Sequence, residues 1–203
     1  VMIALLLIST AGAAERGEGE VRLGRFLSGL KTMEATLVQT LLNPKKEVID
    51  ESEGQFWLSR PGLFRLRYHT PYEQIYVADG AKIWFYDREL EQITVKEQEG
   101  ALGSTPALLL SGEESLDHSF RVEELGLHSG MQWLNLYPKA ADASFDYIRL
   151  ALEGDELRAI EMVDGFGQTT RLYFDQIHRN PPLEASLFTF VPPPGVDVIG
   201  EAE

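Results

Sequence analysis

The chain contains no cysteine. This excludes disulfide bridges, thiolate metal sites and the acylated cysteine that anchors a lipoprotein. Basic residues are also scarce: 18 Lys and Arg stand against 32 Asp and Glu, which gives a formal net charge of −14. Nucleic acid is therefore not expected as a partner, because phosphate binding needs clustered cations, and an anionic membrane surface would repel the chain. An acidic surface does suit transient docking on basic patches of partner proteins.

Signatures of catalysis and of metal binding are missing as well. The four histidines, His69, His118, His128 and His178, show no H-x-H or H-E-x-x-H spacing. No G-x-S-x-G, P-loop or dinucleotide fingerprint occurs, and nothing places a Ser beside a His as a nucleophile–base pair. We therefore expect no catalytic residue, no metal and no cofactor, and a protein that is not an enzyme.

Charge is absent from the first 14 residues, VMIALLLISTAGAA. An apolar run, Met2–Ile8, precedes the small residues Ala11–Ala14, which is typical of the h-region and cleavage site of a secretory signal peptide. We expect residues 1–14 to be that signal, with its basic n-region upstream of Val1, and residues 15–203 to form one domain. A buried N-terminal strand or helix is the alternative. An exported chain that folds without cysteine fits the bacterial periplasm and is not itself lipid-anchored.

Hydrophobic periodicity predicts a mainly β protein. Glu18–Leu30 has the spacing of an amphipathic helix, and from Thr32 to Leu41 apolar and polar residues alternate as in a half-buried strand. Tight turn signals then separate many short alternating segments, which indicates one antiparallel sheet that curls or closes. The further predicted strands are 47–59, 63–69, 74–79, 82–86, 91–97, 119–126, 131–137, 145–152, 156–163, 168–175 and 187–191.

One interior segment, 100–118, breaks this pattern and contains the stretch STPALLLSG. Thr105 can cap a helix and Pro106 fits its first position. So short a helix is unstable alone in water, and the concave face of a curled sheet needs cover. We expect the first helix and the segment 105–117 to cover that face, with Leu108, Leu109 and Leu110 packed against the inside of the sheet.

An arginine follows the inward-facing residues of one predicted strand. In GQFWLSRPGLFRLRY, alternation places Phe56, Leu58 and Arg60 on one face, and Pro61 keeps Arg60 extended. A charge at the rim of an apolar concavity needs acceptors, and the C-terminal carbonyls of the covering helices would supply them. A polar latch between sheet and helices is the functional interpretation; an arginine that reaches solvent at the strand end is the alternative.

The stretches GQFWLSRPGLFRLRY, YVADGAKIWFYDRELEQITV, TPALLLSG and FTFVPPPGVDV, in this order, resemble the periplasmic outer-membrane lipoprotein carrier family (LolA). The resemblance implies an unclosed, strongly curved antiparallel β-barrel with a short-helix lid over an apolar cavity that takes up lipoprotein acyl chains. It implies a latch at Arg60 and a lid that includes Leu27 and Thr105–Gly112. It also places Phe64 near the rim, in the contact area for partners. Leu37, Phe56 and Leu58 are further candidates for the cavity or for partner contacts.

The resemblance further implies an inner-membrane ABC-type release complex as the donor of cargo and an outer-membrane receptor of the same fold as its acceptor. We expect a monomer in the periplasm. Two other functions remain open. The nearest is a carrier of another lipid, of glycolipid type, because apolar pockets discriminate weakly by acyl length. A sensor of mislocalised lipoproteins would require an additional C-terminal domain, for which 203 residues leave no room.

Overall fold

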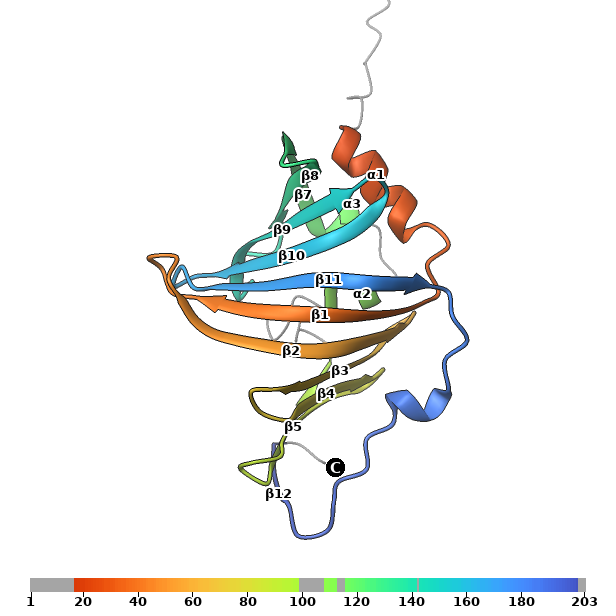
Figure 1. Cartoon of the computed structure of the whole chain (residues 1–203), viewed down its shortest axis with the longest axis vertical. Coiled ribbons are helices and arrows are strands. Elements are labelled where there is room, and N and C mark those ends of the chain that lie inside the picture. Colours follow the sequence, from red (N-terminus) through yellow and green to blue (C-terminus); the bar gives the residue numbers. More distant parts are fainter. Residues whose placement is uncertain (1–16, 99–107, 113–115, 142, 201–203) are drawn as a thin grey trace, which may run out of the picture.

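The computed structural model describes residues 17–98, 108–112, 116–141 and 143–200 (Figure 1). Residues 1–16 lie outside this range, so the predicted signal peptide does too. The described part of the chain is mainly β, as the sequence predicts. Its elements are α1 (Glu18–Leu27), β1 (Thr32–Leu42), β2 (Val48–Ser59), β3 (Leu63–Thr70), β4 (Gln74–Asp79), β5 (Lys82–Asp87), β6 (Gln92–Glu97), α2 (Leu108–Ser111), α3 (Leu116–Ser119), β7 (Phe120–His128), β8 (Met131–Pro138), β9 (Phe145–Glu153), β10 (Glu156–Asp164), β11 (Thr169–Arg179), the 3₁₀ helix η2 (Ala185–Phe188) and β12 (Asp197–Gly200).

The strands form one twelve-stranded sheet in the order β12-β6-β5-β4-β3-β2-β1-β11-β10-β9-β8-β7. Neighbours pair antiparallel, except that β12 runs parallel to β6. The order begins at β12 and ends at β7, so the sheet curves without closing (Figure 1). This confirms the expected unclosed barrel-like architecture.

The apolar face of the sheet is its concave face. Along β1 every second side chain from Met33 to Leu37 is buried, while Thr32, Glu34 and Thr36 between them are partly exposed. The two helices that the sequence predicts as a cover contact this sheet at separate places. α1 lies against β7, β8, β9 and β10, and α2 lies against β2 and β3. The core of the protein therefore sits between the concave face and the two helices.

One sequence-based boundary, the end of the first helix, changes. The helix predicted over Glu18–Leu30 ends at Leu27, because Gly29 takes a positive φ of 71° and turns the chain toward β1. Leu30 still packs in the core, at 4% exposure. In the described part of the predicted lid segment, α2 spans Leu108–Ser111, and Thr105 and Pro106 lie outside the described residues.

The predicted strand 187–191 is wrong. Ala185–Phe188 forms a 3₁₀ helix instead, and the strand β12 that follows at Asp197 was not predicted. The sequence FTF alternates like a strand, but prolines at 181–182 and 192–194 flank it and remove backbone donors that a ladder requires. The VPPPG stretch therefore does not end a strand.

This C-terminal segment covers the outer side of β3, β4 and β5. η2 contacts β3 and β4, and the Arg65 guanidinium donates a hydrogen bond of 3.1 Å to the Leu187 carbonyl. Phe188 is 5% exposed. The Phe190 ring packs 5.7 Å from the Trp84 ring, centroid to centroid. β3 is thus in contact with η2 on one face and with α2 on the other.

Candidate functional site

The candidate site is the contact zone between the concave face and the two helices. Phe56, Leu58 and Phe64 are fully buried there, and Leu37 is 3% exposed. Burial of these side chains follows from strand alternation, since the partners Met33 and Ala35 on β1 face Leu58 and Phe56 on β2. The Phe56 ring packs 6.2 Å from Phe64 and 5.7 Å from Phe174.

Phe64 differs from what the resemblance implies. Its side chain is fully buried in the core cluster, so in this structure it belongs with the apolar lining and offers no surface to a partner. The residue points inward because it pairs with Leu58 across β2 and β3 and shares that strand face.

Leucines from both helices complete the apolar layer. Leu23 and Phe26 of α1 are 2% and 0% exposed, and Leu27 packs partly buried against the same cluster. From α2, Leu109 is 9% exposed and Leu110 is 1% exposed. Leu108 begins α2, and its side chain lies outside what the structure describes. The leucine run thus contributes Leu109 and Leu110 to the inside of the sheet.

Arg60 joins both helices to the sheet. It follows directly on β2 and is half-buried. Its Nη1 donates to the carbonyl of Leu27 at 3.2 Å, at the end of α1, and its Nη2 donates to the carbonyl of Gly112, just after α2. The predicted carbonyl acceptors are therefore confirmed. One guanidinium, with donors in a rigid fork, can satisfy two elements at once.

The loop after Arg60 adds a backbone contact to α2. The Gly62 N–H donates to the Ser111 carbonyl at 2.9 Å, and the Gly62 carbonyl accepts from the Gln98 side chain at 2.7 Å. Gly62 has a φ of 76°, a backbone region that favours glycine. The segment SRPG therefore fixes α2 through one side chain and one backbone amide.

Two charged side chains of the sheet that bind the ends of α1, Arg179 and Glu124, were not predicted from the sequence. Arg179, at the end of β11, donates to the Phe26 carbonyl at 2.7 Å and stacks 5.3 Å from the Phe26 ring. Glu124, on β7, accepts hydrogen bonds from the Gly19 and Glu20 amides at 3.1 and 2.8 Å. A signal existed for Arg179, because the order strand, Arg, Asn180, Pro181 resembles the order strand, Arg60, Pro61.

No cluster of three or more metal-ligating side chains occurs among the described residues. Within the same ranges, no helix is long and apolar enough to span a membrane. Apolar side chains line the interior of the zone described above, and Arg60 lies at its rim. Its chemistry is that of a surface that can exchange one apolar partner, the two helices, for another.

Comparison with known proteins gives the family. A family model described as "Outer membrane lipoprotein carrier protein LolA" matches residues 28–191. A protein of that name from Methylococcus capsulatus is 44% identical over 198 residues, covering 98% of this chain and 95% of the relative. Another from Dechloromonas aromatica is 41% identical over 197 residues, covering 97% and 92%.

Solved structures agree on the fold. An uncharacterized conserved protein from Thermus thermophilus has a TM-score of 0.52 at 18% identity, covering 88% of this chain and 94% of that one. A LolA superfamily protein from Nitrosomonas europaea has a TM-score of 0.50 at 10% identity, covering 84% and 97%. Together with the family match and the close relatives, these observations show that the chain belongs to the LolA family of outer-membrane lipoprotein carrier proteins.

Proposed function

We propose that this chain is a non-catalytic periplasmic carrier, which binds the acyl chains of lipoproteins released from the inner membrane and delivers them to an outer-membrane receptor. The observation that carries the proposal is the apolar concave face, closed by α1 and α2, with Arg60 bonded to both. Family membership supports lipoproteins as the cargo, because the relatives are named outer-membrane lipoprotein carrier proteins.

The energetics favour exchange of the lid for lipid. Burying an acyl chain contributes roughly 0.8 kcal/mol per methylene, so one long chain contributes on the order of 10 kcal/mol. A hydrogen bond to a charged group contributes only about 1.5–3 kcal/mol. Cargo can therefore displace the contacts of Arg60 together with a few leucine contacts. In the empty protein the same contacts keep the apolar face from becoming an exposed, aggregating patch.

The proposed partners are an inner-membrane ABC-type release complex and the outer-membrane receptor. The net charge of −14 supports transient docking on basic surfaces of both. Association driven by such charge is fast and weakens as salt rises. A carrier that has to leave each partner again benefits from contacts of this kind.

Replacing Arg60 with leucine tests the latch. We expect Arg60→Leu to take up a triacylated lipoprotein at least as well as the native chain, because the apolar face is unchanged. Transfer to the receptor should fall at least tenfold, because an open lid no longer competes with the bound acyl chains. Uptake is measured as soluble complex in gel filtration, and transfer is measured as lipoprotein recovered with receptor-bearing vesicles.

Arg88→Leu is the matched control, since Arg88 is an exposed arginine whose partner, Glu73, lies outside the lid. It should leave both steps unchanged. Normal transfer by Arg60→Leu would contradict the latch. Native mass spectrometry of the purified protein covers the alternative cargo: a bound glycolipid, with no lipoprotein taken up, would contradict the proposed cargo while retaining the carrier.

A further inference from the structure

Side chains of the sheet bind both ends of α1, and the charge at each end is opposite in sign to the partial charge of the helix dipole there. A helix carries partial positive charge at its N-terminus and partial negative charge at its C-terminus. Glu124 binds the first end, and Arg60 and Arg179 bind the second. The three side chains come from β7, the end of β2 and β11, so the contacts tie α1 to distant parts of the sheet.

At the N-terminal end, Glu124 takes the place of a capping side chain. The N-cap residue is Gly17, and no side chain of the helix itself caps the first turn. A Cβ atom at Gly17 would lie 2.3 Å from Cγ of Glu124, and one at Gly19 would lie 2.7 Å from its Oε2. The two glycines therefore let the carboxylate reach the helix. Gln132 holds that carboxylate by a hydrogen bond of 2.9 Å.

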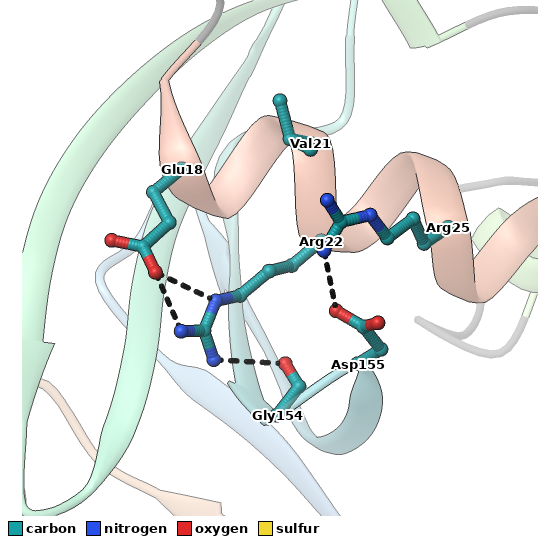
Figure 2. A pocket seen from close by; sticks show the side chains of 6 residues that line it. All are labelled: Glu18, Val21, Arg22, Arg25, Gly154 and Asp155. Carbon is teal, nitrogen blue, oxygen red and sulfur yellow. Dashed lines mark hydrogen bonds and ion pairs between the residues drawn. The ribbon is translucent and has the colours of Figure 1, made fainter.

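Along its side, α1 is joined to the turn between β9 and β10 (Figure 2). Arg22 donates to the Gly154 carbonyl at 3.1 Å while it pairs with Glu18 on its own helix. Arg25 lies 3.5 Å from the Asp155 carboxylate. These contacts line an open pocket of about 540 Å³. They are exposed and individually weak, yet they add a third place at which the helix meets the sheet.

At the C-terminal end, Arg179 at the end of β11 and Asn180 after it hold the helix and the turn that leaves it. Arg179 donates to the carbonyls of Phe26 and Ser28, at 2.7 and 3.4 Å. Asn180 donates to the Gly29 carbonyl at 2.9 Å and accepts from the Lys31 and Thr32 amides at 2.8 and 3.2 Å. This end of α1 therefore stays attached to β11 even without Arg60.

The two hydrogen bonds of Arg60 differ in their surroundings. The bond to Leu27 is partly buried and joins Arg60 to a helix with the independent contacts described above. The bond to Gly112 is exposed, and in the described part of the chain α2 before it spans four residues. Water competes most effectively for an exposed hydrogen bond, and a helix of one turn contributes little stability of its own.

We propose that α1 stays docked on the sheet during cargo exchange, with Glu124 and Arg179 as its positioning residues, and that the contact that opens is the one between Arg60 and Gly112. The inference rests on the proposed function for the event it describes, since cargo exchange is what opens the lid. The geometry of α1 itself is independent of cargo, so the two can be tested separately.

Spin labels measure both helices against one reference, because the chain has no native cysteine. The reference is Phe166→Cys, 90% exposed between β10 and β11, and the α1 reporter is Val21→Cys, 37% exposed. The second reporter is Gly112→Cys, where an added Cβ has no neighbour nearer than 3.9 Å and the carbonyl bonded to Arg60 is kept. Double electron–electron resonance gives the distance distributions 21–166 and 112–166 in the empty protein.

Introducing Arg60→Leu should broaden the 112–166 distribution at least twofold and leave 21–166 unchanged. Adding Arg179→Gln and Glu124→Gln should then broaden 21–166 as well, whereas Arg88→Gln should alter neither. Where the triple variant does not fold by circular dichroism, Arg60→Leu with either single substitution replaces it. Arg179→Lys should restore 21–166 partly, because lysine keeps the charge at the helix end but loses the forked donors.

Two results would overturn the inference: broadening of 21–166 by Arg60→Leu alone, or an unchanged 21–166 after Glu124 and Arg179 are replaced as well. A second measurement adds a triacylated lipopeptide to the spin-labelled chains in which Arg60, Arg179 and Glu124 are kept, where only 112–166 should change. Failure of the lipopeptide to comigrate with the protein would contradict the proposed function, while the lipid-free comparison would still decide the inference about α1.

Discussion

Three arginines, Arg60, Arg179 and Arg65, join separate elements of this protein by donating hydrogen bonds to backbone carbonyls. Arg60 follows β2 directly and Arg179 is the last residue of β11, and both donate to the end of α1. Arg65 binds the carbonyl of Leu187 on the opposite side of the sheet. A guanidinium keeps its charge at any physiological pH, so the strength of these contacts depends on solvent access rather than on protonation.

Asp79 is a residue whose protonation state does affect stability. Burial alone would raise its pKa, yet the backbone N–H groups of Lys82 and Ala81 and the indole N–H of Trp84 outweigh burial and hold the pKa below the ordinary value. The indole donates to Oδ2 at 2.7 Å. The side chain thus organises the turn between β4 and β5 in its ionised form.

A carboxylate with a depressed pKa stabilises the folded state above the unfolded pKa of about 3.9, and this contribution disappears as the pH falls through the lower folded-state value. We expect the stability difference between the native chain and Asp79→Asn to shrink over that acidic interval. Urea unfolding at a series of pH values measures it, and an NMR titration follows the Trp84 indole proton. An Asp79 carboxyl that titrates at or above its ordinary pKa would contradict the assignment.

At the scale of elements, the C-terminal segment acts as a second cover, on the face opposite the lid. Val77 of β4 is fully buried although it lies on the outer face, because η2 and the residues after it pack there. The segment then continues to β12, which adds to the sheet beside β6. Its anchoring therefore depends on a few aromatic side chains, of which Phe188 is the most buried.

Phe188→Ala should destabilise the fold by about 3–5 kcal/mol, the usual cost of removing a buried phenylalanine ring. Phe166→Ala is the matched control, since Phe166 is 90% exposed, and it should change the unfolding free energy by less than about 0.5 kcal/mol. Urea denaturation followed by tryptophan fluorescence gives both values. Equal effects of the two substitutions would show that the segment does not depend on the burial of Phe188.

How far the sequence predicts an element depends on whether its pattern is local. The alternation in β1 and the helical spacing of Leu23, Phe26 and Leu27 were sufficient to predict these two elements. The period of each element alone determines which of its side chains face the core. The alternating FTF stretch was misleading, since its neighbours are prolines and its rings pack on an outer face. The four-residue β12 is too short to carry a pattern.

The sequence predicted one part of the candidate site and not another. Arg60 was found because strand alternation and the following proline fix its direction. Glu124 and Arg179 were missed because they meet α1 across 105 and 153 positions of the chain. Strand pairing and the curvature of the sheet bring those residues to the two ends of one helix. Strand alternation alone does not indicate which distant element such a side chain contacts.

At the scale of the whole molecule, the sheet remains open between β12 and β7. An apolar concave face, a cover of short helices and an acidic surface together suit a protein that takes up lipid, crosses water and gives the lipid away. Because the barrel is not closed by hydrogen bonds, its ends can part without breaking a strand pairing. The small lid then sets how easily the interior is reached.

Release of lipoprotein from membranes tests the central claim most directly. Liposomes that carry the release complex and a triacylated lipoprotein are incubated with ATP, with and without residues 15–203 of this chain. The account predicts that lipoprotein appears in the supernatant as a one-to-one complex, only when the chain is present. Lipoprotein that stays in the membrane fraction under both conditions would contradict the account.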